Sequence, residues 1–285
     1  MNDRNIPPFV NVLIKAIAGI FIVGALTAAF YFSPIPTGDD WQIFQTAALR
    51  ILHGENPYRI GNSFTLFSNP PWLALLVSPL SLLPIRWGWS LLVVIGLILA
   101  IFLAKKLNLD MVKLICLILS PPFLYTLIHG QIDVIVVCSI LLPREWWIIA
   151  GLTKPQTIIG LAFGALRSNY LRTAVITVAF LLGSLVLFGL WPLDLVNVPK
   201  TYAWSTHNIW LGLWPFQVPV GVAIALRGIE QKKDSILLAA SPFFLPYATT
   251  GNLLGLWLAT SMQLSKWQVL IILITWWLAV LFRAL

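Results

Sequence analysis

An apolar stretch over residues 10–32 constrains the fold of this chain more than any other feature. It exceeds the roughly 20 apolar residues that carry a helix across a bilayer. Hydrophobic residues make up 59% of the chain and charged residues 10%, whereas soluble domains carry about 25% charge. The sequence therefore predicts an all-α, polytopic membrane protein. The first run is too long for a signal peptide and lacks a small-x-small cleavage site, so we expect it to remain as an anchor.

Further apolar runs follow along the whole chain, and several are well below the length of a full span. They cover residues 71–83, 87–104, 114–128, 132–142, 146–152, 158–166, 174–190, 209–226, 236–247, 253–264 and 267–282. Short runs broken by Gly or Pro are typical of helices that enter the membrane partway or line an internal cavity. We predict one integral membrane domain, residues 1–285, with about nine to eleven membrane segments, some of them partial.

The basic residues favour one topology. If residues 71–83 form a re-entrant segment, twelve of the 18 Lys and Arg residues fall on the cytoplasmic side, as the positive-inside rule expects. The first outer loop is then residues 33–86, with an amphipathic helix and the re-entrant segment, and the second is residues 191–208. The net charge of +8 is scattered between apolar runs, so it does not indicate nucleic-acid binding. The cytoplasmic loops are short, and we expect any chemistry at the outer face or within the membrane.

Two adjacent carboxylates, Asp39 and Asp40, begin the first outer loop in a chain with only ten acidic residues. The order Asp39-Asp40-Trp41-Gln42 fits a capping box with Asp39 as the N-cap of an interfacial helix. Asp40 would then lie in the first turn, where the helix dipole favours a carboxylate that could act as a general base. The apolar face of this helix is formed by Trp41, Phe44, Ala48 and Ile51, and Gly54 is expected to end it.

Lys154 precedes Pro155, which should break the helix between two short apolar runs. An intramembrane lysine at such a break indicates either a functional site or a snorkelling side chain, and the sequence leaves both open. The polar stretch His129-Gly130-Gln131-Ile132-Asp133 could be a tight turn, with Gly130 after one helix and Asp133 capping the next.

Other polar residues allow a structural and a functional interpretation. His207 closes the second outer loop and could relay a proton or stabilise a phosphate. Arg59 and Arg86 could bind an anion or anchor the chain at the interface. Asn69-Pro70-Pro71-Trp72 should start a helix. Cys116 and Cys138 lie in apolar runs and are expected to be packing residues. No phosphate-binding loop or metal-ligand spacing is present in the sequence.

Several short motifs occur in an order that resembles the integral-membrane glycosyltransferases of the C-type superfamily, and most of all the bacterial polyprenyl-phosphate-mannose-dependent mannosyltransferases. They are Asp40-Trp41-Gln42-Ile43-Phe44, Ala47-Ala48, Leu52-His53-Gly54-Glu55-Asn56-Pro57-Tyr58, Asn69-Pro70-Pro71-Trp72, Ser78-Pro79-Leu80, Gly130-Gln131-Ile132-Asp133, Gly151-Leu152-Thr153-Lys154-Pro155-Gln156 and Ser241-Pro242. The resemblance implies that Asp40 matches the family's catalytic base and Lys154 its lysine before proline. It also implies an inverting reaction that uses a lipid-phosphate sugar from the outer side, often without a divalent metal.

These observations lead us to expect an inverting transfer of a hexose, such as mannose, from a polyprenyl-phosphate carrier to a glycolipid, glycan or protein acceptor. Asp40 and His207 are the expected catalytic residues. The expected substrate-binding residues are Asp39, Tyr58, Arg59, Gln131 and Lys154. No cofactor, metal or nucleic acid is expected, and membrane lipid surrounds the chain. A transporter or flippase, with its polar residues near the membrane midplane, and a non-catalytic family member are the alternatives.

Overall fold

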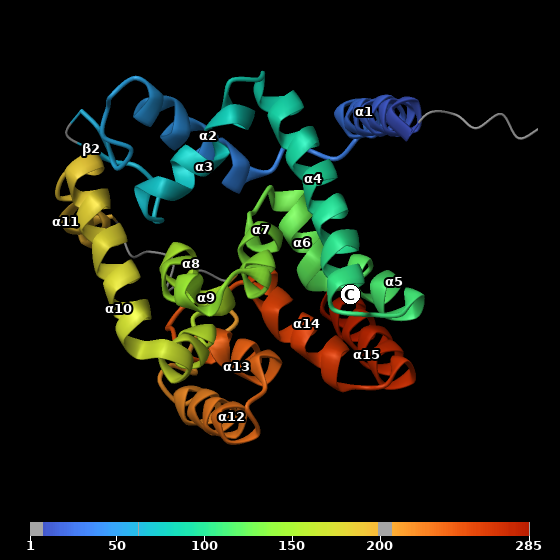
Figure 1. The fold of residues 1–285 in the computed structure, drawn as a ribbon, viewed down its shortest axis with the longest axis vertical. Coiled ribbons are helices and arrows are strands. Elements are labelled where there is room, and N and C mark those ends of the chain that lie inside the picture. The colour runs from blue at the N-terminus through green and yellow to red at the C-terminus, as the bar shows by residue number, and fades with distance from the viewer. Residues whose placement is uncertain (1–7, 62, 199–206, 285) are drawn as a thin grey trace, which may run out of the picture.

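The structure is a computed structural model that describes residues 8–61, 63–198 and 207–284. Within this part the chain is mostly helical (Figure 1). The α-helices are α1 (Pro8–Phe32), α2 (Asp39–Leu52), α3 (Pro71–Ser81), α4 (Ile85–Lys106), α5 (Met111–Ile118), α6 (Pro121–His129), α7 (Asp133–Val137), α8 (Trp147–Thr153), α9 (Pro155–Ile158), α10 (Leu161–Phe188), α11 (Trp191–Asn197), α12 (Val218–Gln231), α13 (Asp234–Ala240), α14 (Leu254–Gln263) and α15 (Lys266–Ala284). Two strands, β1 (Arg59–Ile60) and β2 (Ser63–Phe64), pair antiparallel.

Three helices among the described residues are long and apolar enough to cross a membrane: α1, α4 and α10. The pair α5 and α6 adds a fourth span if the two helices, bent by 47° at their junction, cross together. The all-α class is confirmed, and these helices suggest a membrane protein. The other apolar runs fold as shorter helices such as α3, whose 11 residues are too few for a full span.

The runs predicted at residues 158–166 and 174–190 are joined at a break in the helix. Helix α10 covers the polar stretch between them, and its backbone leaves helical geometry only at Asn169, with φ −153° and ψ 86°. The Asn169 side chain accepts a hydrogen bond from the Arg172 backbone N–H at 3.0 Å, which caps the second half of the helix. The two predicted runs are therefore two helical segments that meet at a sharp turn, across which the Thr173 hydroxyl donates to the Ala165 carbonyl at 3.3 Å.

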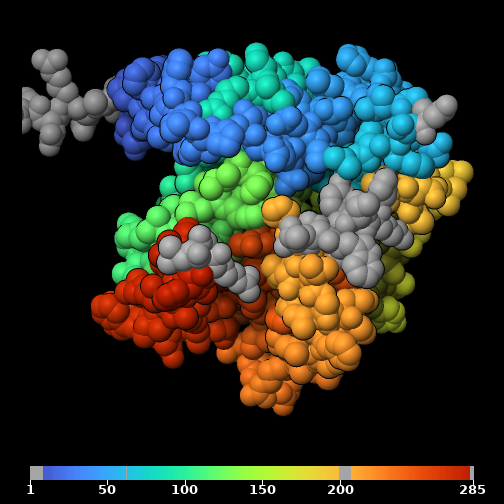
Figure 2. Space-filling view, turned by 180° about the vertical axis from the view of Figure 1, so that it is seen from behind, coloured from blue at the N-terminus to red at the C-terminus, as the bar shows by residue number. Residues whose placement is uncertain are grey.

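The two ends of the molecule gather different parts of the chain (Figures 1 and 2). At one end, Asp194 of α11 accepts hydrogen bonds from Arg59 and Asn56, so the two predicted outer loops meet. At the other end, near α13, Asp234 pairs with Arg144 at 2.5 Å. Two pairs of segments that were predicted to share a side of the membrane thus lie together, and the topology of the whole chain stays a prediction. The side that faces outward stays a prediction.

Helix α1 is attached to the rest of the protein through its C-terminal end. The Arg86 guanidinium, at the start of α4, donates hydrogen bonds to the carbonyl oxygens of Ser33 at 2.6 Å, Tyr31 at 3.1 Å and Ile35. These carbonyls lie at and just after the helix end, where no intrahelical donor is available. Arg86 therefore holds α1 against α4, and an anion-binding role for it is not supported. No residue in the most apolar 18-residue stretch of α1 is buried.

Candidate functional site

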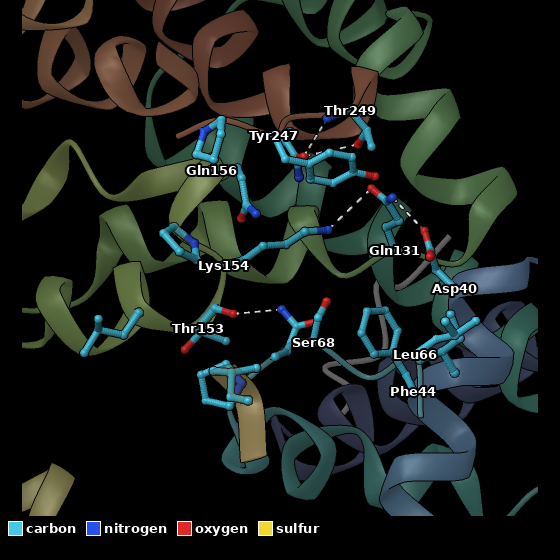
Figure 3. A pocket seen from close by; sticks show the side chains of 18 residues that line it. Asp40, Phe44, Leu66, Ser68, Gln131, Thr153, Lys154, Gln156, Tyr247 and Thr249 are labelled. Atoms are coloured by element: carbon cyan, nitrogen blue, oxygen red, sulfur yellow. Dashed lines mark hydrogen bonds between the residues drawn. The ribbon is translucent and has the colours of Figure 1, made fainter. Parts of the chain in front are cut away.

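A cavity of about 340 Å³ lies between α2, the loop before α7, and the break between α8 and α9. Figure 3 shows Lys154, Gln131 and Asp40 following one another along one side of it, with Leu66 and Phe44 next to Asp40. Tyr247 and Thr249 reach it from the C-terminal part of the chain. The cavity therefore combines a polar strip with an apolar wall. Its volume falls in the range of about 300–1,000 Å³ that is common for ligand sites.

Asp40 reaches this cavity from the first turn of α2. The N-cap of the helix is Gly38, and no side chain makes a capping hydrogen bond there. The predicted capping box with Asp39 as N-cap is therefore wrong, and both carboxylates belong to the first turn, where the helix dipole stabilises negative charge. Asp39 is exposed and does not line the cavity, whereas Asp40 is half-buried and does.

The predicted amphipathic face of α2 fixes this orientation. Trp41, Phe44 and Ala48 are buried, and Ile51 is half-buried. The Trp41 indole N–H donates a hydrogen bond to the Ile85 carbonyl at 3.0 Å, which ties α2 to the start of α4. Burial of this face leaves Asp40 directed toward the cavity.

Gln131 connects Asp40 with Lys154. Its Nε2 donates to Asp40 Oδ2 at 2.6 Å, and its Oε1 accepts from Lys154 Nζ at 3.4 Å. The preceding Gly130 has the left-handed conformation predicted for it, with φ +67°, and a Cβ at this position would lie 2.6 Å from Cβ of Trp41. A glycine is thus required both by the turn and by the close packing of α2. This approach brings Gln131 within reach of a carboxylate 91 residues away.

Lys154 lies at the helix break that Pro155 was expected to cause. Its backbone has φ −149° and ψ 82° between α8 and α9, and Pro155 is the first residue of α9. The side chain is buried and its Nζ lies 2.5 Å from Asp133 Oδ2. Snorkelling to the membrane surface is therefore not what Lys154 does. An ammonium group has three donors, and Asp133 and Gln131 accept two of them.

Asp133 is a buried charge partner rather than a helix cap. The N-cap of α7 is Ile132, with no side-chain capping bond. Asp133 is 0% exposed, and its Oδ1 accepts hydrogen bonds from Asn252 Nδ2 at 2.9 Å and from the Thr157 hydroxyl. A buried carboxylate needs such partners because removing its charge from water is unfavourable. Asp133 and Lys154 therefore form an ion pair with no net charge, and hydrogen-bond donors surround its carboxylate.

The sequence analysis missed Thr157, Thr249 and Asn252. Asn252 is held by a capping box at a 3₁₀ turn, in which its side chain accepts from the Thr249 backbone N–H at 2.8 Å. A Cβ on Gly251 would overlap Gln131 Oε1, so the turn packs directly on the bridging amide. The spacing Thr249-Thr250-Gly251-Asn252, polar between two apolar runs, is the signal that could have identified this element.

The remaining predicted site residues lie elsewhere. Arg59 is about half exposed and binds Asp194 at 2.6 Å. Tyr58 is buried, and its hydroxyl donates to the Asn69 carbonyl at 2.8 Å. Burial, and then the charge of Asp194, raise the pKa of the Tyr58 phenol, so the hydroxyl stays a donor. His207 is exposed and is not among the described residues that line the cavity. Residues 199–206 of the second outer loop, which precede it, lie outside the described part.

The structure therefore brings together Asp40, Gln131 and Lys154 of the predicted site, and it adds Asp133 and Asn252 behind them. No group of three or more His, Cys, Asp and Glu side chains in the described ranges could hold a metal ion. The arrangement offers a carboxylate and a fixed ammonium group on one amphipathic cavity.

Comparisons with known proteins identify no relative: no family model, no curated protein and no solved structure matches this chain.

Proposed function

We propose that the protein is an inverting glycosyltransferase that moves a sugar from a polyprenyl-phosphate carrier to an acceptor hydroxyl. The observation that carries this proposal is the convergence of Asp40, Gln131 and Lys154, from three separate motifs of the sequence, on one cavity. The motifs themselves resemble the C-type glycosyltransferases. The sugar donor in this proposal consists of a sugar phosphate joined to an isoprenoid chain. An amphipathic cavity suits such a donor, because the polar strip can bind the sugar phosphate and the apolar wall can contact the isoprenoid chain.

In this proposal Asp40 is the general base. Oδ2 accepts a hydrogen bond from Gln131, which orients the carboxylate so that Oδ1 can take the proton of the acceptor hydroxyl. The acceptor oxygen forms a bond to the anomeric carbon on the face opposite the phosphate. The bond from that carbon to the phosphate oxygen breaks, and its electron pair leaves with the phosphate. One displacement of this kind inverts the configuration at the anomeric carbon.

Lys154 supports the departure of the phosphate. Its ammonium group is fixed at 2.5 Å from Asp133 and is also bonded to Gln131, so its position does not have to be organised during the reaction. A preorganised donor stabilises charge that develops in the transition state more than charge already present in the substrate. Because Asp133 neutralises Lys154 in the resting site, the cavity attracts an anion only moderately, which helps the carrier phosphate to leave.

The carrier would lie in the bilayer with its sugar near the outer surface, as the distribution of basic residues predicts. A glycolipid, a glycan or a protein could supply the acceptor hydroxyl.

The test compares Asp40→Asn with Asp39→Asn in purified protein reconstituted in liposomes. Transfer of radiolabelled mannose from synthetic polyprenyl-phosphate mannose is measured with a mixture of glycolipid acceptors. We expect Asp40→Asn to lower kcat roughly 10²–10⁴-fold, the contribution of a general base. Asp39→Asn changes an exposed carboxylate in the same helical turn and should retain activity. Undiminished transfer by Asp40→Asn would refute the role of Asp40 as base.

A transporter of a lipid-linked or small solute is the second candidate, and the buried Asp133–Lys154 pair favours it. Ionisable pairs at broken helices are common in transport pathways. The same liposomes distinguish the two functions. Movement of labelled carrier between leaflets that survives Asp40→Asn and stops with Lys154→Met would indicate transport. A wild-type protein with neither activity would indicate a non-catalytic member of the family.

A further inference from the structure

A second cavity, of about 440 Å³, lies behind one wall of the first. Neighbouring residues at two places in the sequence line opposite sides of the wall between the two cavities. Pro70 lines the first cavity and Pro71 the second, and Leu195 lines the first while Asp194 lines the second. The remaining walls of the second cavity come from the segment after α2, from α3 and from the junction of α10 with α11. It is therefore a neighbouring space with its own lining.

The polar lining of the second cavity includes two carboxylates and one amide, those of Glu55, Asp194 and Asn56. Asn56 Nδ2 donates to Asp194 Oδ2 at 2.7 Å, so the amide donor is taken up within the site and the carboxylate oxygens keep further acceptor capacity. Arg50 pairs with Glu55 at 2.9 Å and Arg59 with Asp194 at 2.6 Å, but neither arginine is among the lining residues. The four side chains carry no net charge together, so neither an anion nor a cation gains a large Coulomb attraction. A neutral ligand with many hydroxyl donors makes the best use of carboxylate oxygens arranged in this way.

The apolar lining of this cavity connects it with the lipid-facing surface. Tyr58 and Trp191 are buried in its wall, where they pack on Phe67 and Trp72 and close the inner side of the cavity. Leu75 and Leu187, which also line the cavity, are 45% and 74% exposed on α3 and on α10, a helix long enough to span the membrane. An alkyl chain can therefore leave the cavity along apolar surface, while the polar end stays near Glu55 and Asp194.

We infer that the second cavity binds the neutral, hydroxyl-rich headgroup of a glycolipid. The site is separate from the Asp40–Lys154 cavity and differs from it in the groups it presents. The first cavity presents one carboxylate and one ammonium group, whereas the second presents carboxylates whose arginine partners lie outside the lining. Binding at the second cavity does not depend on sugar transfer.

Three probes with the same alkyl chain and different headgroups test this inference. Octyl glucoside, octyl sulfate and octyltrimethylammonium are titrated below their micelle concentrations into protein in a detergent without sugar, and binding is measured by calorimetry. We expect octyl glucoside to bind best. Asp194→Ala and Glu55→Gln should each weaken it roughly tenfold, as the loss of a hydrogen bond to a charged group implies. The matched control is Glu145→Gln, which removes a carboxylate paired with Arg172 at 3.3 Å and outside the cavity lining.

Several results would overturn the inference. They are equal binding of the three probes, preference for the cationic probe, and equal loss of octyl glucoside binding in the Glu145→Gln control. Loss of octyl glucoside binding in Lys154→Met, with Asp194→Ala unaffected, would place the sugar in the first cavity and equally refute the second site. Glu55 is exposed, so its variant keeps the test valid if Asp194→Ala folds poorly. A wild-type protein that binds octyl glucoside and transfers no sugar would refute only the proposed reaction.

Discussion

Removing the charge of Lys154 gives the sharpest test of the buried pair. In Lys154→Met, Asp133 keeps its charge at a position with no exposed surface. Breaking a buried ion pair in this way costs about 3–5 kcal/mol. Thr157 and Asn252 still donate hydrogen bonds to Asp133, so we expect a loss near the lower end of that range.

Changing both partners should recover much of that loss. In the double variant Lys154→Met, Asp133→Asn no buried charge remains, and the new amide oxygen can accept the hydrogen bonds from Thr157 and Asn252. The remaining deficit should be about 1–2 kcal/mol, the scale of one or two imperfect hydrogen bonds. The double variant should therefore be more stable than Lys154→Met alone by about 1–2 kcal/mol, whereas independent sites would make it less stable.

Unfolding can be followed in mixed micelles with an increasing fraction of sodium dodecyl sulfate. Cys116 is buried and Cys138 is half-buried, and both are free thiols, so the rate of thiol labelling reports unfolding. Glu145→Gln, at a more exposed ion pair, should change the stability by less than about 1 kcal/mol. A double variant less stable than Lys154→Met would contradict the assignment of Asp133 and Lys154 as a mutually neutralising pair.

Two further predictions concern the surroundings of this pair. Gly251→Ala should displace Gln131, because a Cβ there overlaps its Oε1, and should lower transfer from a polyprenyl-phosphate sugar at least tenfold while circular dichroism shows retained helix. Tyr58→Phe should destabilise by about 1 kcal/mol near neutral pH, since the hydrogen bond to the Asn69 carbonyl is lost. The raised pKa of Tyr58 makes wild-type stability fall as pH rises above about 10, so the difference between the two proteins should shrink there; a constant difference would contradict this.

The helical class and much of the local geometry could be predicted from the sequence. The apolar face of α2, the turn at Gly130 and the break at Pro155 depend on residues within a few positions of one another, so periodicity and backbone preferences are sufficient. Asp39 was misassigned as the N-cap because a capping motif indicates which residue is able to cap a helix but not where the helix begins. Gly38 takes the N-cap position instead, and a Cβ there would overlap the carbonyl of His129.

The core of the candidate site could be predicted only in part. Asp40, Gln131 and Lys154 were identified singly, but nothing local indicates that Asp133 pairs with Lys154 or that Asn252 closes the network. The first contact joins residues that are 21 positions apart in the sequence, and the second joins residues that are 119 apart. Both depend on how the helices pack rather than on local preference.

Gly38 and Gly130 together set how closely α2 can approach the loop before α7. At each, the main chain lies so close to a neighbouring segment that a single methyl group does not fit. A ligand therefore cannot draw α2, which carries Asp40, any nearer to the loop that carries Gln131. Any closing of the cavity around a substrate has to come from its other walls, such as the segment that carries Leu66.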